Sequence, residues 1–414
     1  MSPLPSSRAL PRGFRYAATA CGLKTRGSHG LLDLALIVSD TPASAAAVFT
    51  QNLVQAAPVT LSRAHVRASP ESMRAVIVNS GNANCSTGPA GMEASRATAQ
   101  RVAELLGCEP QQVMVCSTGV IGVPMQVGRI LRSAPRLAES LSASPRAFGG
   151  LTRAIMTTDT RPKWAAATRR IGGHDIRVAG CAKGAGMIHP NMATMLAFVV
   201  TDAAVAAPVL DRALREVVTR TFNAISIDGD TSTNDTLLVL ASGASGGRTI
   251  AQASGRNYAE FVRTLEQVCQ ALALAIVADG EGATRVLEIQ VRGAPSGRAA
   301  AQVARTVAGS SLVKTALSGA DPNWGRILAA AGRAGIPFNP ERAEIWLGGM
   351  KMYGWSDDSR VSAALPLNER AAHRRLLAKH IPIVVDLHRG RGQARVWTCD
   401  FTKDYVDINA SYRT

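Results

Sequence analysis

The sequence predicts a layered α+β or α/β protein in which helices cover mostly buried sheets. Three observations lead to this prediction. Short apolar runs rich in β-branched residues alternate with longer segments of helical spacing, the last third of the chain returns to strands, and no internal repeat or long linker interrupts the pattern. A chain of 414 residues, 46% of them hydrophobic, can build a substantial core and suggests two to three domains. Composition does not locate the boundaries between them.

The first two thirds of the chain alternate strands and helices. The expected strands, each a short apolar run, are residues 34–38, 75–79, 113–116, 177–179 and 195–201. A helix is expected over residues 93–106, where apolar residues recur at helical spacing and Gly107 supplies a natural C-cap. Further helices are expected over 207–222 and 258–277, and the apolar end of the latter predicts that it is buried.

The last third is expected to contain mainly strands, over residues 286–291, 344–347, 383–387 and 394–398. Pro382 suits the start of the third of these and would not suit a central strand position. Residues 389–392 are expected to form the hairpin turn between the last two strands. A strand over 404–408 is expected to anchor the end of the chain.

Composition excludes several classes of function. The net charge of +16 comes mostly from arginines spread over every segment, and only 4% of residues are aromatic, which favours steering of anionic substrates over nucleic-acid binding. Seven scattered cysteines form no CxxC pair and indicate neither a disulfide framework nor a zinc site. No Walker, HExxH or dinucleotide-binding motif is present, so we expect chemistry without a metal or cofactor. No apolar core of a signal peptide follows the basic start, which leads into the predicted strand at 34–38, and the cytoplasm is the expected compartment.

The most unusual segment, residues 183–201, reads KGAGMIHPNMATMLAFVVT. It places Thr194 at the entrance of an apolar strand, where a rigidly held hydroxyl would suit a nucleophile. Threonine needs an adjacent base, which can be its own α-amine once the preceding peptide bond is cut. From residue types alone, the simpler interpretation is a loop that enters a core strand. A triad with His189 as base is disfavoured, because His189 precedes a proline in an irregular segment.

Three further segments are candidates for function. CSTGVIG at 116–122 follows a strand and could offer backbone N–H groups to an anion, or be a simple strand-to-helix turn. DGEGAT at 279–284 places Glu281 between two glycines that could expose its carboxylate to an ammonium group or a metal, or be an ordinary surface turn. DGDTSTND at 228–235 is only a weak metal signal, because it lacks the glycine and the final glutamate of a calcium loop.

Taken together, these segments resemble the ornithine acetyltransferase family, over nearly the whole chain from Gly13 and Phe14 onward. The segment KGAGMIHPNMATMLAFVVTDA resembles the family's processing site, with cleavage between Ala193 and Thr194. The other motifs that carry the resemblance are TPASAAAVFTQN at 41–52, NSGNAN at 79–84, STGVIG at 117–122, MTTDTRPK at 156–163, FNAISIDGDTSTNDT at 222–236, DGEGAT at 279–284, GADPNWGRI at 319–327 and the final YVDINASYRT. One departure is Ala185, where the family commonly has serine.

The resemblance implies an αββα layered sandwich, of the type shared with self-processing aminopeptidases. It implies self-cleavage into an α-chain, residues 1–193, and a β-chain, residues 194–414, which form one intertwined catalytic unit and pair into dimers of αβ units. Thr194 is then the nucleophile. By the family's pattern, the oxyanion hole falls on Thr118 and Gly119, and the substrate-binding positions fall on Thr157, Lys183, Thr194, Glu281, Asn409 and Thr414.

The reaction that the resemblance implies is transfer of acetyl from N-acetylornithine to glutamate through an acetyl-Thr194 intermediate, within arginine biosynthesis. Acetyl-CoA is a second donor in some family members, and no residue known to us decides this. Among the side chains, Lys183 suits a substrate carboxylate and Glu281 an ammonium group of ornithine. The alternative functions are a self-processing aminopeptidase and a non-catalytic basic binding protein.

Overall fold

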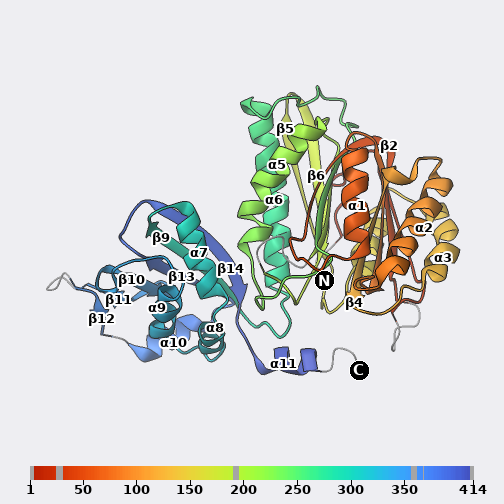
Figure 1. Cartoon of the computed structure of the whole chain (residues 1–414). Coiled ribbons are helices and arrows are strands. Elements are labelled where there is room, and N and C mark those ends of the chain that lie inside the picture. The colour runs from red at the N-terminus through yellow and green to blue at the C-terminus, as the bar shows by residue number, and fades with distance from the viewer. Residues whose placement is uncertain (1–3, 25–30, 190–194, 356–360, 367, 411–414) are drawn as a thin grey trace. The chain divides into compact units, whose positions relative to one another are not determined.

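The computed structural model describes residues 4–24, 31–189, 195–355, 361–366 and 368–410. The chain divides into two compact units (Figure 1). Unit 1 comprises Met1–Met187, Asn191–Asn223 and Asp230–Ile276, and unit 2 comprises Ile188–Pro190, Ala224–Gly229 and Val277–Thr414. Each unit has its own sheet and its own core, and each is described by itself.

Unit 1 alternates strands and helices along most of its length. Its elements are β1 (Phe14–Thr19), β2 (Leu34–Phe49), α1 (Ala57–Ala68), β3 (Met73–Asn82), α2 (Gly88–Leu106), β4 (Val113–Val120), α3 (Val127–Glu139), α4 (Pro145–Ala154), β5 (Lys163–Ile171), β6 (His174–Lys183), β7 (Leu196–Thr201), α5 (Ala207–Arg220), β8 (Thr236–Ala241) and α6 (Gly255–Val277), with short 3-10 turns at Pro110–Gln112 and Phe222–Ala224. The expected C-cap at Gly107 is confirmed by its left-handed φ of 63°.

A single long strand, β2, takes part in two sheets. Its first part, from Leu34 to Val38, pairs antiparallel with β1 and β3, and its last part, from Ser44 to Phe49, pairs antiparallel with β8. The register breaks between these parts. The strand order is therefore β1-β2-β3-β4 in the first sheet and β2-β8-β7-β6-β5 in the second. One strand crossing between them lets the two sheets face each other.

The faces of these sheets show four layers. Apolar side chains of both sheets meet in one buried cluster, which includes Ile37 and Val76 of the first sheet and Phe198 and Leu238 of the second. The opposite face of the first sheet packs on α1, α2 and α3. Helices α5 and α6 lie along the second sheet (Figure 1), and α6 approaches so closely that a Cβ at Gly180 would lie 3.2 Å from Leu272. The expected αββα sandwich is confirmed within unit 1.

Unit 2 is built on a six-stranded sheet of order β12-β11-β10-β13-β9-β14. Its elements are β9 (Val286–Ala294), α7 (Gly297–Ala308), α8 (Ser311–Ser318), α9 (Trp324–Gly332), a 3-10 turn (Pro340–Arg342), β10 (Glu344–Leu347), β11 (Met350–Gly354), β12 (Ala363–Ala364), α10 (Glu369–Leu376), β13 (His380–Asp386), β14 (Gly392–Cys399) and α11 (Lys403–Ala410). Helices α7, α8, α9 and α10 bury their apolar sides against this sheet.

The expected hairpin at 389–392 is wrong. Strand β9 lies between the two strands, parallel to β13 and antiparallel to β14. The glycines of the connection serve a close approach: a Cβ at Gly390 would lie 2.5 Å from the Ala294 carbonyl oxygen, and one at Gly392 only 2.2 Å from the Ser296 carbonyl carbon. Gly390 and Gly392 therefore allow contact with a distant backbone and do not form a hairpin turn.

Two other expectations in unit 2 are also wrong. Pro382 is the third residue of β13, which is a central strand. It lies opposite Gly348, just beyond the end of β10. Its missing N–H therefore falls at the margin of the β10–β13 ladder. Residues 404–408 form part of the helix α11, not a strand. There the ring of Tyr405 packs on Phe401, which lies just before the helix, at 4.4 Å between centroids.

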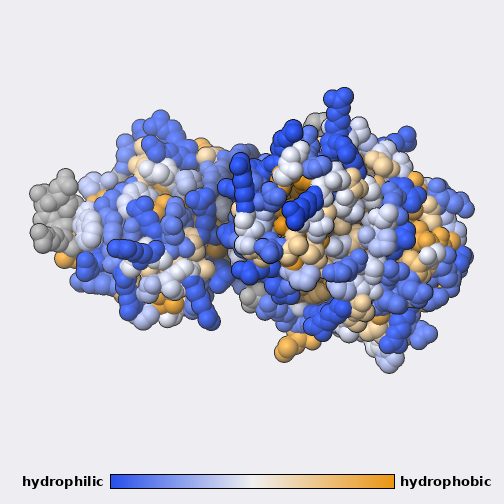
Figure 2. Space-filling model, turned by 90° about the horizontal axis from the view of Figure 1, so that it is seen from above, coloured by the Kyte–Doolittle hydropathy of each residue, from blue (hydrophilic) through white to orange (hydrophobic). Residues whose placement is uncertain are grey.

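None of the helices in the described part of the chain has the length and apolar character that crossing a membrane requires. The face of the molecule seen in Figure 2 is mostly hydrophilic, and its hydrophobic areas are small and interrupted.

Candidate functional site

In unit 1, two predicted residues come together between the sheets, where β4 and β6 end. Lys183 pairs with Leu196 across β6 and β7, on the face that looks toward the first sheet. Its Nζ donates a hydrogen bond of 3.0 Å to Oγ1 of Thr118, and both side chains are buried. Because an ammonium group only donates, Thr118 keeps its own hydroxyl proton for another acceptor. Lys183 therefore orients the Thr118 hydroxyl so that its proton remains available to a third group.

Gly119 lies inside strand β4, which runs to Val120, so the expectation of a turn directly after residue 116 is wrong. Its φ is +133°, in the range that favours glycine. A Cβ at this position would lie 2.4 Å from the carbonyl carbon of Gly81 and 2.6 Å from the nitrogen of Asn82. The backbone of β3 therefore approaches Gly119 too closely for any side chain.

A buried carboxylate that the sequence reasoning did not single out, Asp159, organises the surroundings of Lys183. It accepts hydrogen bonds from Nζ of Lys163 at 2.5 Å, from the N–H of Gly184 at 2.8 Å and from the N–H of Thr157 at 2.9 Å. Burial raises the pKa of Asp159, but the charges of Lys163 and Lys183 outweigh it and hold the pKa below its usual value. Thr157 is thereby fixed beside the loop that follows β6.

The only sequence signal for Asp159 was its place in the motif MTTDTRPK. A second buried carboxylate, Asp235, belongs to the weak metal signal at 228–235 and to the family motif at 222–236. Both carboxyl oxygens of Asp235 lack a hydrogen-bond partner among the described residues. Burial raises the pKa of Asp235 well above its usual value, although the charge of Lys183 favours the ionised form. The pKa values of these two carboxyl groups around one lysine are thus shifted in opposite directions.

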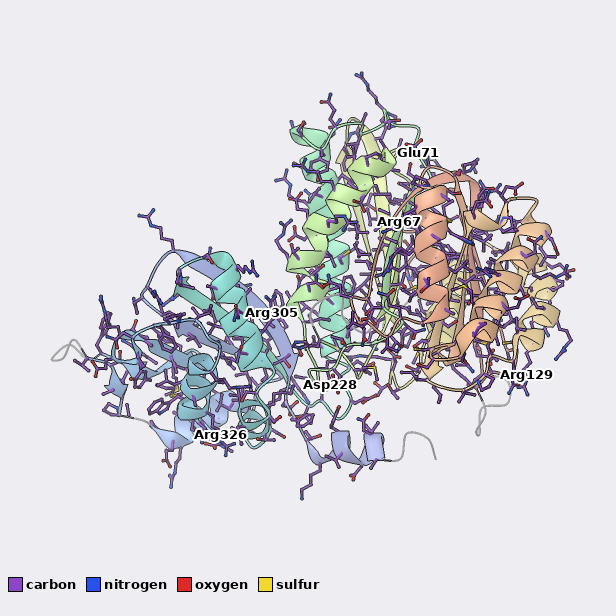
Figure 3. The ribbon with its side chains drawn as sticks, in the orientation of Figure 1. Arg67, Glu71, Arg129, Asp228, Arg305 and Arg326 are labelled. Carbon is purple, nitrogen blue, oxygen red and sulfur yellow. The ribbon has the colours of Figure 1, made fainter. Side chains whose placement is uncertain are left out.

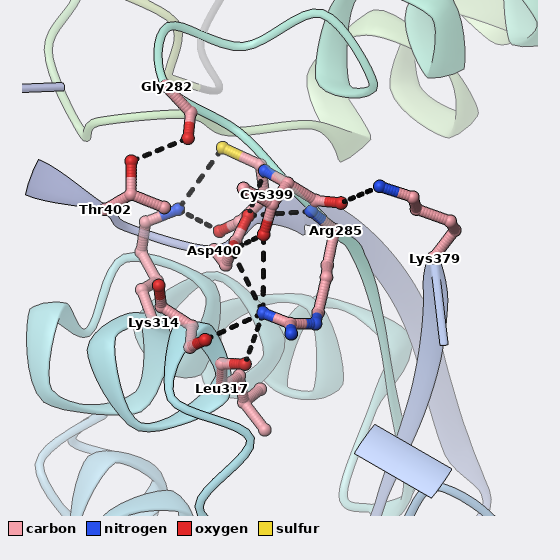
Figure 4. Close-up of polar contacts among 10 residues, drawn as sticks. Gly282, Arg285, Lys314, Leu317, Lys379, Cys399, Asp400 and Thr402 are labelled. Carbon is pink, nitrogen blue, oxygen red and sulfur yellow. Dashed lines mark hydrogen bonds and ion pairs between the residues drawn. The ribbon is translucent and has the colours of Figure 1, made fainter. Parts of the chain in front are cut away.

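In unit 2, Asp279, Gly280 and Glu281 of the segment DGEGAT are buried, so the expectation that flanking glycines expose Glu281 is wrong. The loop is held by the segment that follows β14 (Figure 4). Asp400 accepts hydrogen bonds of 2.8 Å from the N–H groups of Thr284 and Arg285, and Thr402 donates one of 2.7 Å to the carbonyl of Gly282. The buried ammonium of Lys314 donates to Thr398 at 3.0 Å and to the carbonyl of Cys399.

This loop brings two predicted binding residues together. Nδ2 of Asn409, on α11, donates a hydrogen bond of 2.8 Å to Oε2 of Glu281. On the same helix, Tyr405 donates one of 3.3 Å to Asp228, which is labelled in Figure 3 and also accepts from the N–H of Ile188 at 2.9 Å. Helix α11 is thus joined to the loop that carries Glu281.

Three predicted positions lie outside the described residues, namely Ala193 and Thr194 of the cleavage site and Thr414. His189 is described, and its Nδ1 lies 3.2 Å from Oγ of Ser226. Ala185, the departure from the family pattern, is buried. A serine there would need a hydrogen-bond partner for its hydroxyl.

Other nucleophiles and metal ligands are poorly placed for chemistry. All seven cysteines are free, and burial raises the pKa of Cys116 and of Cys181, which lie in strands beside the predicted site, to about 12. Within the described residues, one group, Glu344, Asp386 and His388, has the spacing of metal ligands. Its carboxylates already pair with Lys351 and Arg292, which disfavours a cation there.

The groove of about 640 Å³ over the second half of β2 is lined by none of the predicted residues. Its walls come from α1 and α5, and Arg67 and Glu71, labelled in Figure 3, lie at its rim near the end of α1. Two of its arginines already have partners, since Arg215 pairs with Asp211 and Arg63 contacts Gln55.

Comparison with known proteins gives sequence matches over nearly the full chain and a structural match over 52% of it. The family model described as the ArgJ family matches residues 15–414. A protein of Symbiobacterium thermophilum named arginine biosynthesis bifunctional protein ArgJ is 47% identical over 414 residues and covers 100% of both chains. Its namesake in Geobacter sulfurreducens is 48% identical, over 97% of this chain and 99% of that one. A solved structure of that name from Bacillus halodurans is 41% identical, with a TM-score of 0.49 over 52% of this chain and 98% of that one.

Proposed function

Because the chain belongs to the ArgJ family, we propose that it transfers the acetyl group of N-acetylornithine to glutamate, which gives ornithine and N-acetylglutamate for arginine biosynthesis. The match over residues 15–414 carries this proposal and favours it over peptide hydrolysis by a self-processing aminopeptidase. The Lys183–Thr118 hydrogen bond supports it, because Thr118 accepts this bond and keeps its hydroxyl proton to donate to an oxyanion.

In the proposed mechanism, the precursor first cuts itself between Ala193 and Thr194, and the freed α-amine of Thr194 serves as the base. An α-amine has a reference pKa of about 7.7–8.0, so it can take the Thr194 hydroxyl proton near neutral pH. The hydroxyl oxygen attacks the acetyl carbonyl carbon of N-acetylornithine. The C–N bond then breaks, the proton passes to the leaving amine, and ornithine departs from acetyl-Thr194.

The second half of the reaction reverses these steps with another amine. The α-amino group of glutamate attacks the acetyl ester, one proton moves through the Thr194 amine to the threonine oxygen, and N-acetylglutamate leaves. In both halves, Thr118 and the N–H of Gly119 stabilise the oxyanion, and loss of one such donor typically costs about 3–4 kcal/mol. Thr157, Lys183, Glu281, Asn409 and Thr414 bind the two amino-acid substrates.

The nucleophile is tested at Thr194 itself. Thr194→Ala is expected to abolish both cleavage and transfer, because it removes the only hydroxyl at the junction, whereas Thr194→Ser is expected still to cleave. A denaturing gel and N-terminal sequencing of the larger fragment, expected to begin Thr-Met-Leu-Ala-Phe, measure cleavage. Acetyl transfer by the Thr194→Ala protein would overturn the mechanism.

The donor is tested by one assay with glutamate as acceptor and two donors, N-acetylornithine and acetyl-CoA. We propose that both are used, since the two relatives described above are named bifunctional. If N-acetylornithine serves as donor and acetyl-CoA does not, the activity is restricted to recycling of acetyl groups. Failure with N-acetylornithine would contradict the proposed function.

The rest of the proposal follows from the family resemblance. The α- and β-chains remain together and pair into dimers of αβ units, in the cytoplasm. The reaction uses no metal or cofactor, with acetyl-CoA entering only as a substrate, and the partners include neither nucleic acid nor membrane.

A further inference from the structure

The buried side chain of Asn234 connects the two sheets of unit 1 beside the predicted oxyanion hole. Its Nδ2 donates hydrogen bonds to the carbonyl of Ser117 at 2.8 Å and to that of Ala83 at 2.6 Å, and its Oδ1 accepts one from the Thr233 hydroxyl at 2.7 Å. Both amide protons are therefore used. Asn234 directly precedes the Asp235–β8 segment of the second sheet, whereas Ser117 lies in β4 of the first and Ala83 directly follows β3.

The Ser117 carbonyl belongs to the same planar peptide unit as the N–H of Thr118. A hydrogen bond that fixes this carbonyl also fixes the plane from which Thr118 and then Gly119 extend. On the other side, the backbone of β3 contacts Gly119 so closely that no Cβ fits. The segment is thus held from β3 by close packing and from the second sheet by the amide of Asn234.

We propose that Asn234 is a positioning residue of the oxyanion hole, whose amide sets the directions of the Thr118 hydroxyl and of the Gly119 N–H through the Ser117–Thr118 peptide. This inference rests on the proposed acetyl transfer. Donors at such a site must be held within about 0.5 Å of the productive geometry by the residues around them. Their misplacement weakens binding of the transition state and not of the substrate, so it lowers kcat with little change in KM.

A purely structural tie between the sheets would behave differently. It would lower the melting temperature, but enzyme assayed well below that temperature would keep its kcat. A second buried asparagine of the same unit, Asn84, offers the comparison. It also donates two hydrogen bonds, to the Gly91 carbonyl at 2.9 Å and to Ser95 Oγ at 3.0 Å, and these point toward α2.

The test compares Asn234→Asp with Asn84→Asp, since aspartate keeps the shape of asparagine and removes both donors. Asn234→Ser is a milder second variant, without a buried charge and with one hydroxyl donor. Self-cleavage, kcat and KM for N-acetylornithine with glutamate, and the melting temperature are measured for each full-length protein.

Asn234→Asp is expected to lower kcat by about 100-fold or more, as loss of one oxyanion donor does, with KM within about threefold of wild type. The kcat of Asn234→Ser is expected to lie between those of wild type and Asn234→Asp. Asn84→Asp is expected to keep the wild-type kcat even where its melting temperature falls. If an Asn234 variant stays uncut, its cleavage rate relative to Asn84→Asp replaces kcat as the measure.

Failure of the positioning role and failure of the proposed function give different results. Wild-type kcat and cleavage in both Asn234 variants, or losses that match those of Asn84→Asp at equal melting temperature, would overturn the positioning role while the proposed function stands. Absence of acetyl transfer in the wild-type enzyme would instead remove the proposed function, and this inference with it.

Discussion

At the residue scale, the end of β4 combines two neighbours with opposite requirements. Thr118 must keep its side chain, because its hydroxyl receives the hydrogen bond from Lys183. Gly119 must have none, because its φ of +133° and the nearby backbone of Gly81 leave no space for a Cβ. A hydroxyl followed by the N–H of a residue without a side chain is a suitable pair of donors for a developing oxyanion.

Gly119→Ala is expected to slow self-cleavage and to lower kcat by roughly 100- to 1,000-fold, because the new methyl group must displace the N–H that stabilises the oxyanion. Steady-state kinetics of the matured variant measure this. Gly122→Ala is the matched control, since Gly122 also has a positive φ, +79°, but a Cβ there meets nothing within 4 Å. Equal kcat values in the two variants would exclude Gly119 from the oxyanion hole.

Asp235 predicts a dependence of stability on pH. Its pKa is raised by burial, so the folded protein keeps the proton while the unfolded chain releases it above a pKa of about 3.9. Stability from this group is therefore present at low pH and is lost as pH rises from about 4 toward the folded pKa. Asp235→Asn is expected to remove this loss, so that its melting temperature relative to wild type is higher at pH 8 than at pH 5.

Thermal melts at the two pH values measure the effect of Asp235→Asn. Asp175→Asn, at an exposed position that follows the start of β6, is the control and is expected to leave the difference between the two pH values unchanged. The same difference in wild type and in Asp235→Asn would show that the buried carboxyl titrates as an ordinary one.

At the element scale, α11 is a short helix whose role is to bring the chain end to the Glu281 loop. None of its described residues is buried, so it contributes little to the core. Its contacts are directional instead, through Asn409 to Glu281 of the loop and through Tyr405 to Asp228 of another segment. An element held in this way is suited to carry binding groups.

Asn409→Ala is expected to lower kcat/KM for N-acetylornithine by about 10- to 150-fold, because a hydrogen bond to a charged group is worth about 1.5–3 kcal/mol. Asp407→Ala, at an exposed position of the same helix, is the control and is expected to keep kcat/KM. Deletion of residues 412–414 is expected to cause a similar loss while cleavage survives. Unchanged kinetics in Asn409→Ala and in the deletion would assign the tail to an ordinary terminus.

At the scale of the whole molecule, residues on both sides of the predicted cleavage point share one sheet. Strand β7 pairs with β6, and β8 pairs with β2, so two strands from beyond residue 194 lie between strands from before it. Cutting one peptide bond removes none of these ladders. The layers of unit 1 would therefore hold the two chains together after cleavage.

The purified protein is expected to give two bands on a denaturing gel, roughly 20 and 23 kDa in proportion to the 43.4 kDa chain. On native size exclusion the two chains are expected to elute together, because separating them would expose the apolar faces of β7 and β8. Elution of the chains as separate species would contradict the intertwined arrangement, and a single uncut, fully active chain would contradict the mechanism.

The sequence by itself determined the family, the layered α+β class and many of the strands. Periodicity and apolar runs are local, and a family motif such as DGEGAT or STGVIG is contiguous, so both can be read along the chain. The same locality explains the failures. Residues 404–408 have strand-forming residues but form a helix through contacts with Phe401, Glu281 and Asp228, and the glycines at 390 and 392 look like a hairpin turn but fit against a distant backbone.

Only the tertiary structure decided which polar residues act on one another. Asp159 reaches Gly184, Lys183 reaches Thr118 and Asn234 reaches Ser117 across separations of 25 to 117 residues. A hydrogen bond depends on distance and direction in space, and burial together with neighbouring charges sets the direction in which the pKa of a carboxyl such as that of Asp159 or Asp235 is shifted. Neither hydrogen-bond geometry nor burial is a property of residue type or spacing, because both arise only when the two sheets pack together over the strand ends.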